Sequence, residues 1–445
     1  MKTGFSRECI TPPMGIHMSG YYETRVAKGV LDDLFVSAVS FDDGNKKAVI
    51  IGVDTLMMAS SQCRKCIKLV ADKCSIDEKS IFINCSHTHT GGSIDLKPLG
   101  NNPGDKEYEK YMFEKIAEAA KKSFENMKDS AFFAADGKAE NISFLRRYKM
   151  KNGNTQTNPG VENPDIDQPL GMVNDTVKLL KIVRDDGDDI FIINFGTHAD
   201  TVGGEMISAD WPGFVRNTIE KALDGVKCLF LTGAQGDVNH INPHPTTFDR
   251  IGLDYNTFDG VPRSYSHAKH MGQVVAGAVL QICEKAVPID NNEIAFETLE
   301  VVLPSNQDNS RLEEAERIYK LHEEGKDSEI PFEKMELTTV IAEARRIVTL
   351  QNGPESFAYT ISGIKIGEAV FLGTPGELFS EIGLKIQENS QFATTFVCCL
   401  TNGGDTYFPT SSAYDEGGYE SRTSFLKKGG DKIIIDSMKT LCKKL

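Results

Sequence analysis

Short apolar runs, each bounded by polar or glycine-rich residues, recur along the chain. Their length and their content of Val, Ile and Phe are typical of strands that are buried on both faces. We therefore expect a strand at each of six runs: KAVIIGV from Lys47, SIFINC from Ser80, DIFIINF from Asp189, KCLFLTG from Lys227, GEAVFLG from Gly367 and TTFVCCL from Thr394.

Helical patterns lie between these runs. Residues 105–125 begin with a capping aspartate and continue with apolar positions at helical spacing. Residues 210–223 begin with Asp-Trp-Pro, which suits an N-cap followed by proline in the first turn. Residues 264–285 begin with a capping serine and have an apolar middle. Strands that alternate with helices predict an α/β fold, with a mixed, largely parallel central sheet flanked by helices.

Two parts of the chain depart from this alternation. Residues 291–303 and 356–366 have the pattern of alternating, more exposed strands. Between them, residues 309–350 predict two charged helices joined by a polar turn. We therefore expect a single domain over residues 1–445, with a short helical insertion at 304–355. We interpret the insertion as an outer cover rather than a lid.

The composition is that of an ordinary globular protein, with 40% hydrophobic and 25% charged residues. A net charge of −15 argues against nucleic acid and anionic membranes as partners, because both attract basic surfaces. No apolar run reaches the ~20 residues that span a bilayer. Residues 1–11 contain no apolar stretch of signal-peptide length. These features predict a cytoplasmic protein without a membrane span.

The ten cysteines are scattered along the chain, as expected for reduced thiols in a cytoplasmic protein. Cys63 and Cys66 form the one close pair, which could indicate a redox or metal motif. The pair lies on a predicted helix and no second pair accompanies it, so we interpret both cysteines as structural.

Chemically capable side chains follow the buried runs directly. His87 and His89 follow the second run, His198 follows the third, and Glu377 and Tyr407 follow the last two. Ligands of open α/β sheets bind just beyond the carboxyl ends of the strands. If the strands are parallel neighbours, these side chains meet in one pocket.

Each of these residues also has a structural interpretation. Alternate residues at a strand end point the same way, so His87 and His89 suit zinc, although they could be hydrogen-bonded loop histidines. His198 alone fits either role. Glu377 follows Pro-Gly and could cap a helix beginning at Leu378. Tyr407 alone would indicate packing. The interpretation of the set as a metal site therefore depends on the expected convergence.

Several segments in order resemble the catalytic domain of the neutral ceramidases. They are GFSRECITPP, MSGYYE, SHTHTGG, THADTVGG, LTGAQGDVN, TPGELF and the segment from Tyr407 to Tyr419, which ends in GGYES. The resemblance runs from about Gly4 to Tyr419. It implies a zinc-dependent amide hydrolase, with one Zn²⁺ per chain and a small-molecule N-acyl or O-acyl substrate.

The resemblance also assigns roles to individual residues. It implies that zinc is held by four ligands: His87, His198, Glu377 and Tyr407. His89 and Tyr419 resemble the family's residues that polarise the scissile amide and stabilise its oxyanion. Arg146, in FLRRY, falls near an arginine-bearing segment of the family. Asp237, in the GDVN turn, is expected either to orient a ligand histidine or simply to form the turn.

The chain departs from the family pattern in two places. Asn239 stands where the family typically has a serine after Gly-Asp-Val. A counterpart of the C-terminal sandwich domain of ceramidases is also missing from this sequence. We therefore expect a smaller, more polar substrate than a sphingolipid, cleaved at an amide or ester bond by metal-activated water.

Two other functions fit the same residues. One is a deacylase of acylated carbohydrate. Residues 148–168 are polar and rich in Asn, Gly and Pro, and this expected long surface loop offers Tyr148, Asn154 and Asn158 to a sugar. The other is a non-catalytic, zinc-stabilised binding protein, which Asn239 favours. The presence of both His89 and Tyr419 argues for catalysis, because a structural zinc requires neither.

Overall fold

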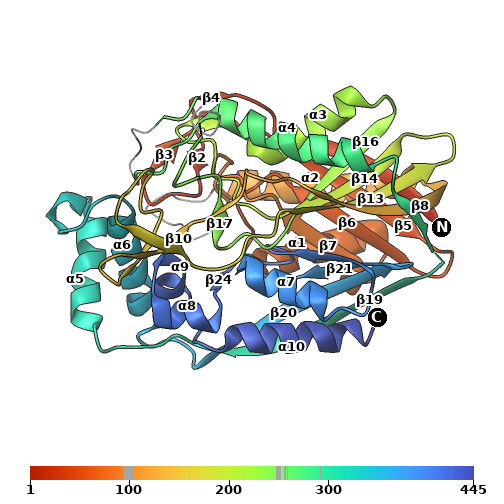
Figure 1. Ribbon diagram of the computed structural model, residues 1–445. Helices are drawn as coiled ribbons and strands as arrows, with labels where there is room; N and C mark the ends of the chain where they lie inside the picture. Colours follow the sequence, from red (N-terminus) through yellow and green to blue (C-terminus); the bar gives the residue numbers. More distant parts are fainter. Residues whose placement is uncertain (95–104, 247–251, 255–256, 258, 291) are drawn as a thin grey trace.

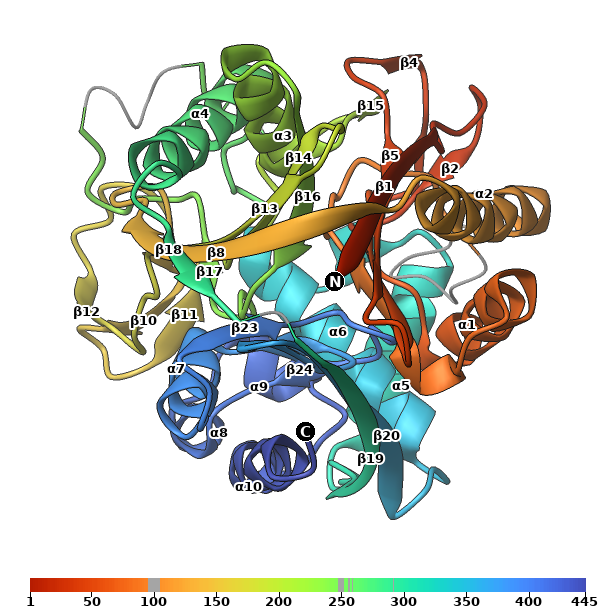
Figure 2. The same cartoon turned by 90° about the vertical axis from the view of Figure 1, so that its right-hand side faces the viewer.

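Two β-sheets pack face to face, and helices cover both outer faces, so the chain forms four layers (Figures 1 and 2). The computed structural model describes residues 1–94, 105–246, 252–254, 257, 259–290 and 292–445. Helices α5 and α6 form a lobe at one end of the molecule, on the left in Figure 1, and both chain termini lie toward the opposite end.

The larger sheet has the strand order β16-β14-β13-β8-β1-β5-β6-β7, with β18 beside β8. Its strands are β1 Lys2–Cys9, β5 Phe35–Asp42, β6 Lys47–Val53, β7 Ile81–Cys85, β8 Lys128–Lys138, β13 Thr176–Arg184, β14 Asp189–Phe195, β16 Val226–Thr232 and β18 Val287–Ile289.

The smaller sheet has the order β19-β20-β21-β23. Its strands are β19 Ile294–Pro304, β20 Ser356–Ile366, β21 Ala369–Gly373 and β23 Thr394–Cys398. The two strands expected at 291–303 and 356–366 are β19 and β20, and Asn291 lies outside the described residues.

All six apolar runs are strands, and together they form three parallel pairs: β6 with β7, β14 with β16, and β21 with β23. The mixed sheet flanked by helices is confirmed. The prediction that it is largely parallel is wrong, because the remaining pairs in both sheets are antiparallel. The antiparallel strands β1, β5, β8 and β13 carry polar residues within their apolar pattern, so they do not stand out as continuous runs.

Aromatic residues fill the space between the sheets. Phe82 on β7 meets Phe371 on β21 edge to face, with ring centroids 6.4 Å apart. Phe371 in turn stacks on Phe396 of β23, at 4.6 Å. All three side chains are fully buried. Burial of such rings stabilises the sheet-on-sheet contact and fixes the strand ends that carry the site.

The outer helices occupy two sides. The larger sheet is covered by α1 Ser60–Cys74, α2 Lys106–Glu125, α3 Asp210–Ala222 and α4 Tyr265–Ile282, and the smaller sheet by α7 Ser380–Glu388 and α10 Gly430–Cys442. Asp105 caps α2 and Ser264 caps α4, as predicted. Asp210 does not cap α3. It is the first residue of the helix, and its carboxylate accepts the backbone N–H groups of Thr201 and Val202 as well as that of Trp211.

The insertion contains helices α5 Leu312–Glu323 and α6 Lys334–Leu350. They pack on each other around a small core of their own, which includes Ile318, Ile341 and Ile347. Helix α6 also contacts the short helix α9 Tyr419–Thr423, which begins with a candidate catalytic residue. The insertion is thereby connected to the site.

Short strands organise the loops. They are β2 His17–Met18, β3 Arg25–Val26, β4 Gly29–Val30, β9 Phe144–Leu145, β15 Met206–Ile207, β17 Val238–Asn239, β22 Glu377–Leu378 and β24 Tyr407–Phe408. Residues 148–168, expected to be a long surface loop, are largely exposed but contain short strands. They contribute to a three-stranded sheet of β10 Arg147–Met150, β11 Thr155–Thr157 and β12 Ile166–Pro169. Backbone hydrogen bonds between these strands hold the polar segment in place.

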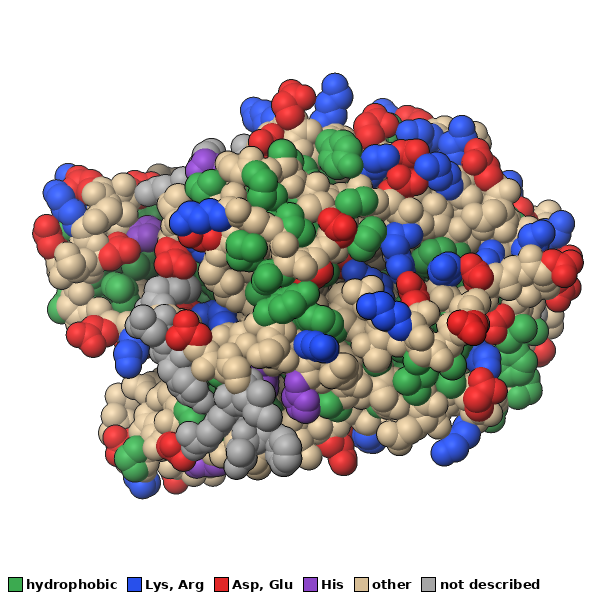
Figure 3. Space-filling view, turned by 90° about the horizontal axis from the view of Figure 1, so that it is seen from above, with side chains coloured by type: hydrophobic (Ala, Val, Ile, Leu, Met, Phe, Trp, Pro, Cys, Tyr) green, Lys and Arg blue, Asp and Glu red, His purple; other side chains and the backbone are tan. Residues whose placement is uncertain are grey.

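Surface and cysteine features agree with the sequence. Acidic and basic side chains are interspersed over the face shown in Figure 3. All ten cysteines are free thiols, and Cys63 and Cys66 are buried on α1. Among the described residues, no helix combines the length and apolar character that crossing a membrane requires.

Candidate metal centre

The segments that follow the parallel strand pairs meet at one place between the two sheets. The backbone N–H of Cys85 donates to the Leu400 carbonyl at 3.2 Å, and that of Cys399 donates to the Thr232 carbonyl at 3.1 Å. These bonds join the ends of β7, β23 and β16. The short strands β22 and β24 then pair in parallel and place Glu377 beside Tyr407. The geometry therefore brings together segments that lie far apart in sequence.

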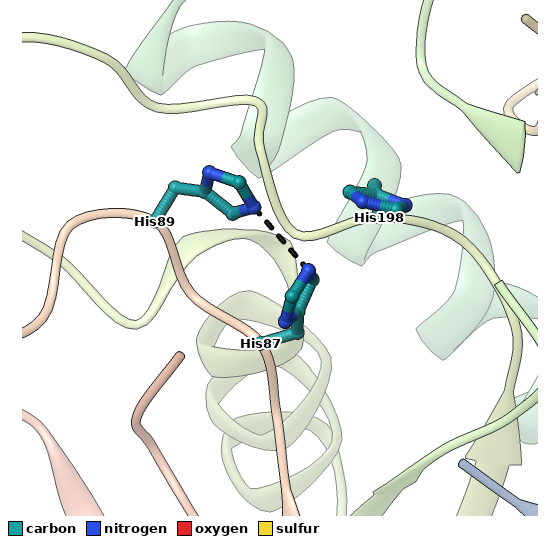
Figure 4. Close-up of side chains that lie close together, drawn as sticks. All are labelled: His87, His89 and His198. Atoms are coloured by element: carbon teal, nitrogen blue, oxygen red, sulfur yellow. Dashed lines mark hydrogen bonds between the residues drawn. The ribbon is translucent and has the colours of Figure 1, made fainter. Parts of the chain in front are cut away.

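Three histidines lie at this junction, and Figure 4 shows their rings pointing toward one another. One ring nitrogen from each of His87, His89 and His198 can be chosen so that all three lie within 4.8 Å of one another. Nε2 of His89 lies 3.3 Å from Nε2 of His87. All three side chains are buried. Such a cluster is a candidate metal site.

Backbone carbonyls fix the tautomers of two histidines. Nδ1 of His87 lies 2.9 Å from the Leu56 carbonyl, and Nδ1 of His198 lies 2.9 Å from the Gln235 carbonyl. A carbonyl only accepts hydrogen bonds, so each Nδ1 carries the proton and each Nε2 of the neutral ring presents a lone pair. Arg146 supports this assignment, because its Nη1, a donor, lies 3.2 Å from Nε2 of His198.

Glu377 adds a carboxylate to the same point. Its Oε2 lies 3.3 Å from Nε2 of His87 and 3.2 Å from Nε2 of His198, and it accepts a hydrogen bond from Gln235 at 3.1 Å. Burial alone would raise the pKa of Glu377, but His87 and His198 outweigh it and hold the pKa well below its usual value. Burial, followed by the charge of Arg146, lowers the pKa of His198.

The backbone at His87 is strained in order to place its ring. Its φ of +69° lies in the left-handed region, which costs a non-glycine residue on the order of 1 kcal/mol or more. The His87 N–H donates to the Thr55 carbonyl at 3.0 Å, and the His89 N–H donates to the Ala199 carbonyl at 3.1 Å. The surrounding fold thus holds this turn in a conformation that it would not adopt alone.

Arg146, which is buried, pairs with the partly exposed Tyr407 next to the histidines. Arg146 Nη2 donates to the Tyr407 hydroxyl at 3.2 Å, while Arg146 Nε donates to Glu420 at 2.6 Å. Burial, with a contribution from Glu377, raises the pKa of the Tyr407 phenol well above its usual value, and Arg146 opposes this shift. Arg146 therefore favours the ionised form of the phenol, which is the form that binds a metal.

The proposed catalytic residues His89 and Tyr419 face a cavity of about 390 Å³. His87, Glu377 and Tyr407 line the same cavity. The ring centroids of Tyr407 and Tyr419 are 5.7 Å apart, and the rings meet edge to face. Burial lowers the pKa of His89 well below its usual value, so its ring is neutral near pH 7. The cavity thus presents a neutral imidazole and a phenol beside the candidate metal ligands.

The side chains of Asp237 and Asn239 are engaged outside the described lining of the cavity. Asp237 Oδ1 accepts the backbone N–H of Ser380 at 2.7 Å and its hydroxyl at 2.8 Å, so it serves the first turn of α7 and contacts no ligand histidine. Asn239 donates to Asn158 at 2.9 Å. Neither is among the described residues that line the cavity, and neither are Tyr148, Asn154 and Asn158. The backbone carbonyls of Leu56 and Gln235 take the orienting role that was considered for Asp237.

An ionic cluster behind His89 was not singled out from the sequence. Arg263 binds Asp200 through Nε and Nη2, at 2.8 and 2.9 Å, and Tyr21 donates to the same carboxylate. Asp200 Oδ1 lies 3.9 Å from Nδ1 of His89. Asp200 stands in THADTVGG and Tyr21 in MSGYYE. Both segments resemble the neutral ceramidases, and this resemblance could have pointed to the two residues.

No protein-family model and no curated protein matches the sequence. Solved structures do match. The neutral ceramidase from Pseudomonas aeruginosa aligns with a TM-score of 0.74 at 16% identity, over 99% of this chain and 74% of that chain. A ceramidase complexed with C2 aligns with the same TM-score and coverage at 15% identity. The chain therefore has the neutral-ceramidase fold.

Proposed function

We propose that the protein is a zinc-dependent hydrolase that cleaves an amide or ester bond of a small acylated substrate. The observation that carries this proposal is the convergence of lone pairs. Oε2 of Glu377 lies 3.3 Å from Nε2 of His87 and 3.2 Å from Nε2 of His198. Each Nδ1 donates to a backbone carbonyl, so both Nε2 lone pairs and the carboxylate oxygen converge on one point, where a metal cation could bind all three atoms.

The donor set fits zinc. His87 and His198 offer neutral imidazole nitrogens, Glu377 a carboxylate oxygen and Tyr407 a phenolic oxygen. Nitrogen and oxygen donors of these types, held by backbone carbonyls behind the rings, are those that catalytic zinc sites use. His89 is the alternative third histidine of the cluster. We assign it to the reaction because it lines the cavity and its Nδ1, unlike those of His87 and His198, has no hydrogen-bond partner among the described residues.

A bound zinc would supply a water molecule of lowered pKa and a Lewis acid for the substrate carbonyl. The protein's own groups do the rest. Neutral His89 can take the proton from the attacking water and return it to the leaving group, and the Tyr419 hydroxyl can donate to the oxyanion. The acyl carbon gains a hydroxyl, its bond to nitrogen or oxygen breaks, and the amine or alcohol leaves with the proton.

The neutral-ceramidase fold supports this function, because the two aligned structures are ceramidases by name. Within that fold we propose a smaller acyl compound as substrate. The carbohydrate-deacylase alternative loses its supporting feature, since Tyr148, Asn154 and Asn158 lie outside the described lining of the cavity. Asn239 is also not among the described residues that line the cavity, so it gives little support to a purely binding role.

The test is hydrolysis of a panel of N-acyl and O-acyl compounds, from ceramide and short N-acyl amino alcohols to acylated sugars. We expect turnover of at least one member, its loss after treatment with a chelator, and its recovery on addition of Zn²⁺. Turnover that a chelator leaves unchanged would refute the metal, and absence of turnover by zinc-loaded protein would refute the hydrolase.

A further inference from the structure

Residues 233–238 lie between the two segments that carry His198 and Glu377. The backbone N–H of Gly233 donates at 2.9 Å to the carbonyl of the last residue of β14, the strand that leads to His198. The N–H of Gly236 donates at 2.7 Å to the carbonyl of Leu378, which follows Glu377 in β22. The segment 233–238 is thereby hydrogen-bonded to both ligand-bearing segments and sets the spacing between them.

Two glycines allow these backbones to approach closely. A Cβ at Gly236 would lie 2.7 Å from the carbonyl oxygen of Glu377. A Cβ at Gly196, two residues before His198, would overlap the carbonyl oxygen of Ala234. Glycine in such places marks the close approach of another backbone. The segment therefore has little freedom to move away from either ligand.

Gln235, in the middle of this segment, contacts both ligands directly. Its backbone carbonyl accepts the Nδ1–H of His198 at 2.9 Å. Its side-chain Nε2 donates at 3.1 Å to Oε2 of Glu377, the oxygen that faces the two histidine Nε2 atoms. One residue thus fixes the direction of a ring lone pair through its backbone and of a carboxylate oxygen through its side chain.

The side-chain amide of Gln235 is satisfied only on its nitrogen side. The residue is fully buried, and its Oε1 has no hydrogen-bond partner among the described residues. A buried acceptor without a partner costs free energy that an apolar group of similar size would not cost. An amide at this position is therefore unfavourable for folding, which indicates that it is kept for the N–H group that it directs at Glu377.

The hydrogen bond from Gln235 removes a freedom that a glutamate otherwise has. The last side-chain torsion of glutamate has a broad distribution, so its two oxygens can turn away from a metal site at little cost. A donor on Oε2 restricts that rotation and favours the ionised carboxylate. Hydrogen bonds that orient metal ligands in this way commonly contribute a factor of about 10 to 100 in metal affinity.

We propose that Gln235 is a positioning residue of the metal centre: its side-chain amide holds Glu377 in the direction that binds the ion, at a cost in the stability of the fold. This inference rests on the metal centre of the proposed function and adds a residue that controls how tightly the ion is held. It predicts that metal affinity and folding stability respond in opposite directions to the loss of the amide.

Gln235→Met tests this directly, because methionine has a similar length but neither the N–H donor nor the unpartnered oxygen. The backbone carbonyl that accepts from His198 remains. We expect the Kd for Zn²⁺, measured by competition with a chromophoric chelator, to rise about 10- to 100-fold. The Tm of the metal-free protein, measured by calorimetry in excess chelator, should stay the same or rise.

Gln62→Met is the matched control. Gln62 is also buried, but its Oε1 accepts the N–H of Ala59 at 2.9 Å and its Nε2 donates to Glu109. Both sides of this amide are used in packing α1, so Gln62→Met should lower the Tm and leave the Kd for Zn²⁺ unchanged. Gln235→Asn keeps an amide that is one methylene too short to reach Glu377. It should weaken zinc binding as Gln235→Met does, and it decides the point if Gln235→Met does not fold.

The outcomes separate this proposal from the hydrolase function. An unchanged Kd for Zn²⁺ in Gln235→Met would overturn the proposal. A weaker Kd with a loss of Tm as large as that of Gln62→Met would also overturn it, because a packing defect would explain both. Wild-type protein that hydrolyses a substrate without binding zinc would do the same. Zinc binding that depends on Gln235, without turnover of any amide or ester, would retain the proposal and refute the hydrolase.

Discussion

The two walls of the cavity are built by different means. On the strand side, His87 and His198 are buried, and backbone carbonyls fix the direction of each ring. On the insertion side, Arg345 lines the cavity and is half-buried on helix α6. Ion pairs between partly exposed side chains hold this helix in place. The first wall carries reacting groups and has little freedom, whereas the second is held by contacts that substitution and pH can weaken.

This difference separates chemistry from selectivity. A reacting group must be placed to within about 1 Å, because a larger error costs on the order of 100-fold in rate. A group that contacts the substrate away from the reacting bond tolerates more movement. We therefore expect changes in the strand wall to act on kcat and metal content, and changes in the insertion wall to act on KM and on the choice of substrate.

The largest effect should come from Glu377→Gln. The change keeps the shape of the side chain but removes the negative charge that lies 3.2–3.3 Å from two Nε2 atoms. We expect loss of bound zinc and a fall in kcat/KM of at least about 1,000-fold, since the metal supplies several kcal/mol to the transition state. Metal analysis and hydrolysis of the same preparation check this. A variant with full zinc and near-normal turnover would contradict the ligand assignment.

His89→Ala should separate a reacting histidine from a ligand. A general acid–base group contributes about 100- to 10,000-fold, so we expect a loss in that range while zinc content stays unchanged. Metal analysis decides the point. If His89→Ala loses zinc as completely as Glu377→Gln does, the site is a three-histidine centre and His89 is one of its ligands.

Gly20→Ala should act on the position of His89. Gly20 has φ +116°, and an added Cβ would lie 2.8 Å from Nδ1 of His89. We expect kcat to fall by about 100-fold without loss of zinc. Gly15→Ala is the control, because Gly15 has φ +82° in the neighbouring loop before β2 and no atom within 4 Å of the added Cβ. Both variants lose on the order of 1 kcal/mol of stability through backbone strain. Equal activities of the two would refute the steric argument.

Glu343→Gln should loosen the insertion wall. The Glu343 side chain is 12% exposed and binds both Arg422 and Arg311, the latter 49% exposed. Because these partners are partly solvated, we expect a loss of only about 1–2 kcal/mol in the free energy of unfolding. KM for the preferred substrate should rise severalfold with little change in kcat. Urea unfolding and steady-state kinetics measure the two effects, and a kcat effect larger than the KM effect would contradict the division between the walls.

The same carboxylate predicts a pH dependence of stability. Burial alone would raise the pKa of Glu343, but Arg422 and the neighbouring arginines outweigh it and lower the pKa below its ordinary value of 4.5. A depressed pKa means that the stabilisation is present above pH 4.5 and is lost as the pH falls through the lower folded value. The wild-type protein should therefore lose more stability below pH 4.5 than Glu343→Gln does. Parallel losses would show that the carboxylate contributes nothing there.

The strand wall was largely predictable from sequence, for a physical reason. Strands in the parallel pairs of the two large sheets are buried on both faces and appear as uninterrupted apolar runs, and all six of these strands were predicted in this way. The side chains just after such strands necessarily lie at one edge of the sheet. The antiparallel strands, such as β8 and β13, mix polar with apolar residues, and this is why the proportion of parallel pairing was overestimated.

The insertion wall could not be predicted in the same way. Arg345 and Arg346 are adjacent on a charged helix, and only tertiary packing decides that Arg345 faces the cavity while Arg346 binds backbone carbonyls. Asp237 illustrates the same limit. Its turn follows a strand like the others, but its side chain points to α7 rather than to the histidines. Position after a strand brings a residue to the site, whereas the direction of its side chain depends on local packing.

Zinc content and amide hydrolysis of His198→Ala test the central claim most directly. His244→Ala, which removes an exposed histidine, is the matched control. We predict one zinc per chain and chelator-sensitive turnover in the wild type and in His244→Ala, and loss of both in His198→Ala. Full zinc occupancy with unchanged turnover in His198→Ala would contradict the account, because the lone pair of this Nε2 would then have no part in holding the metal.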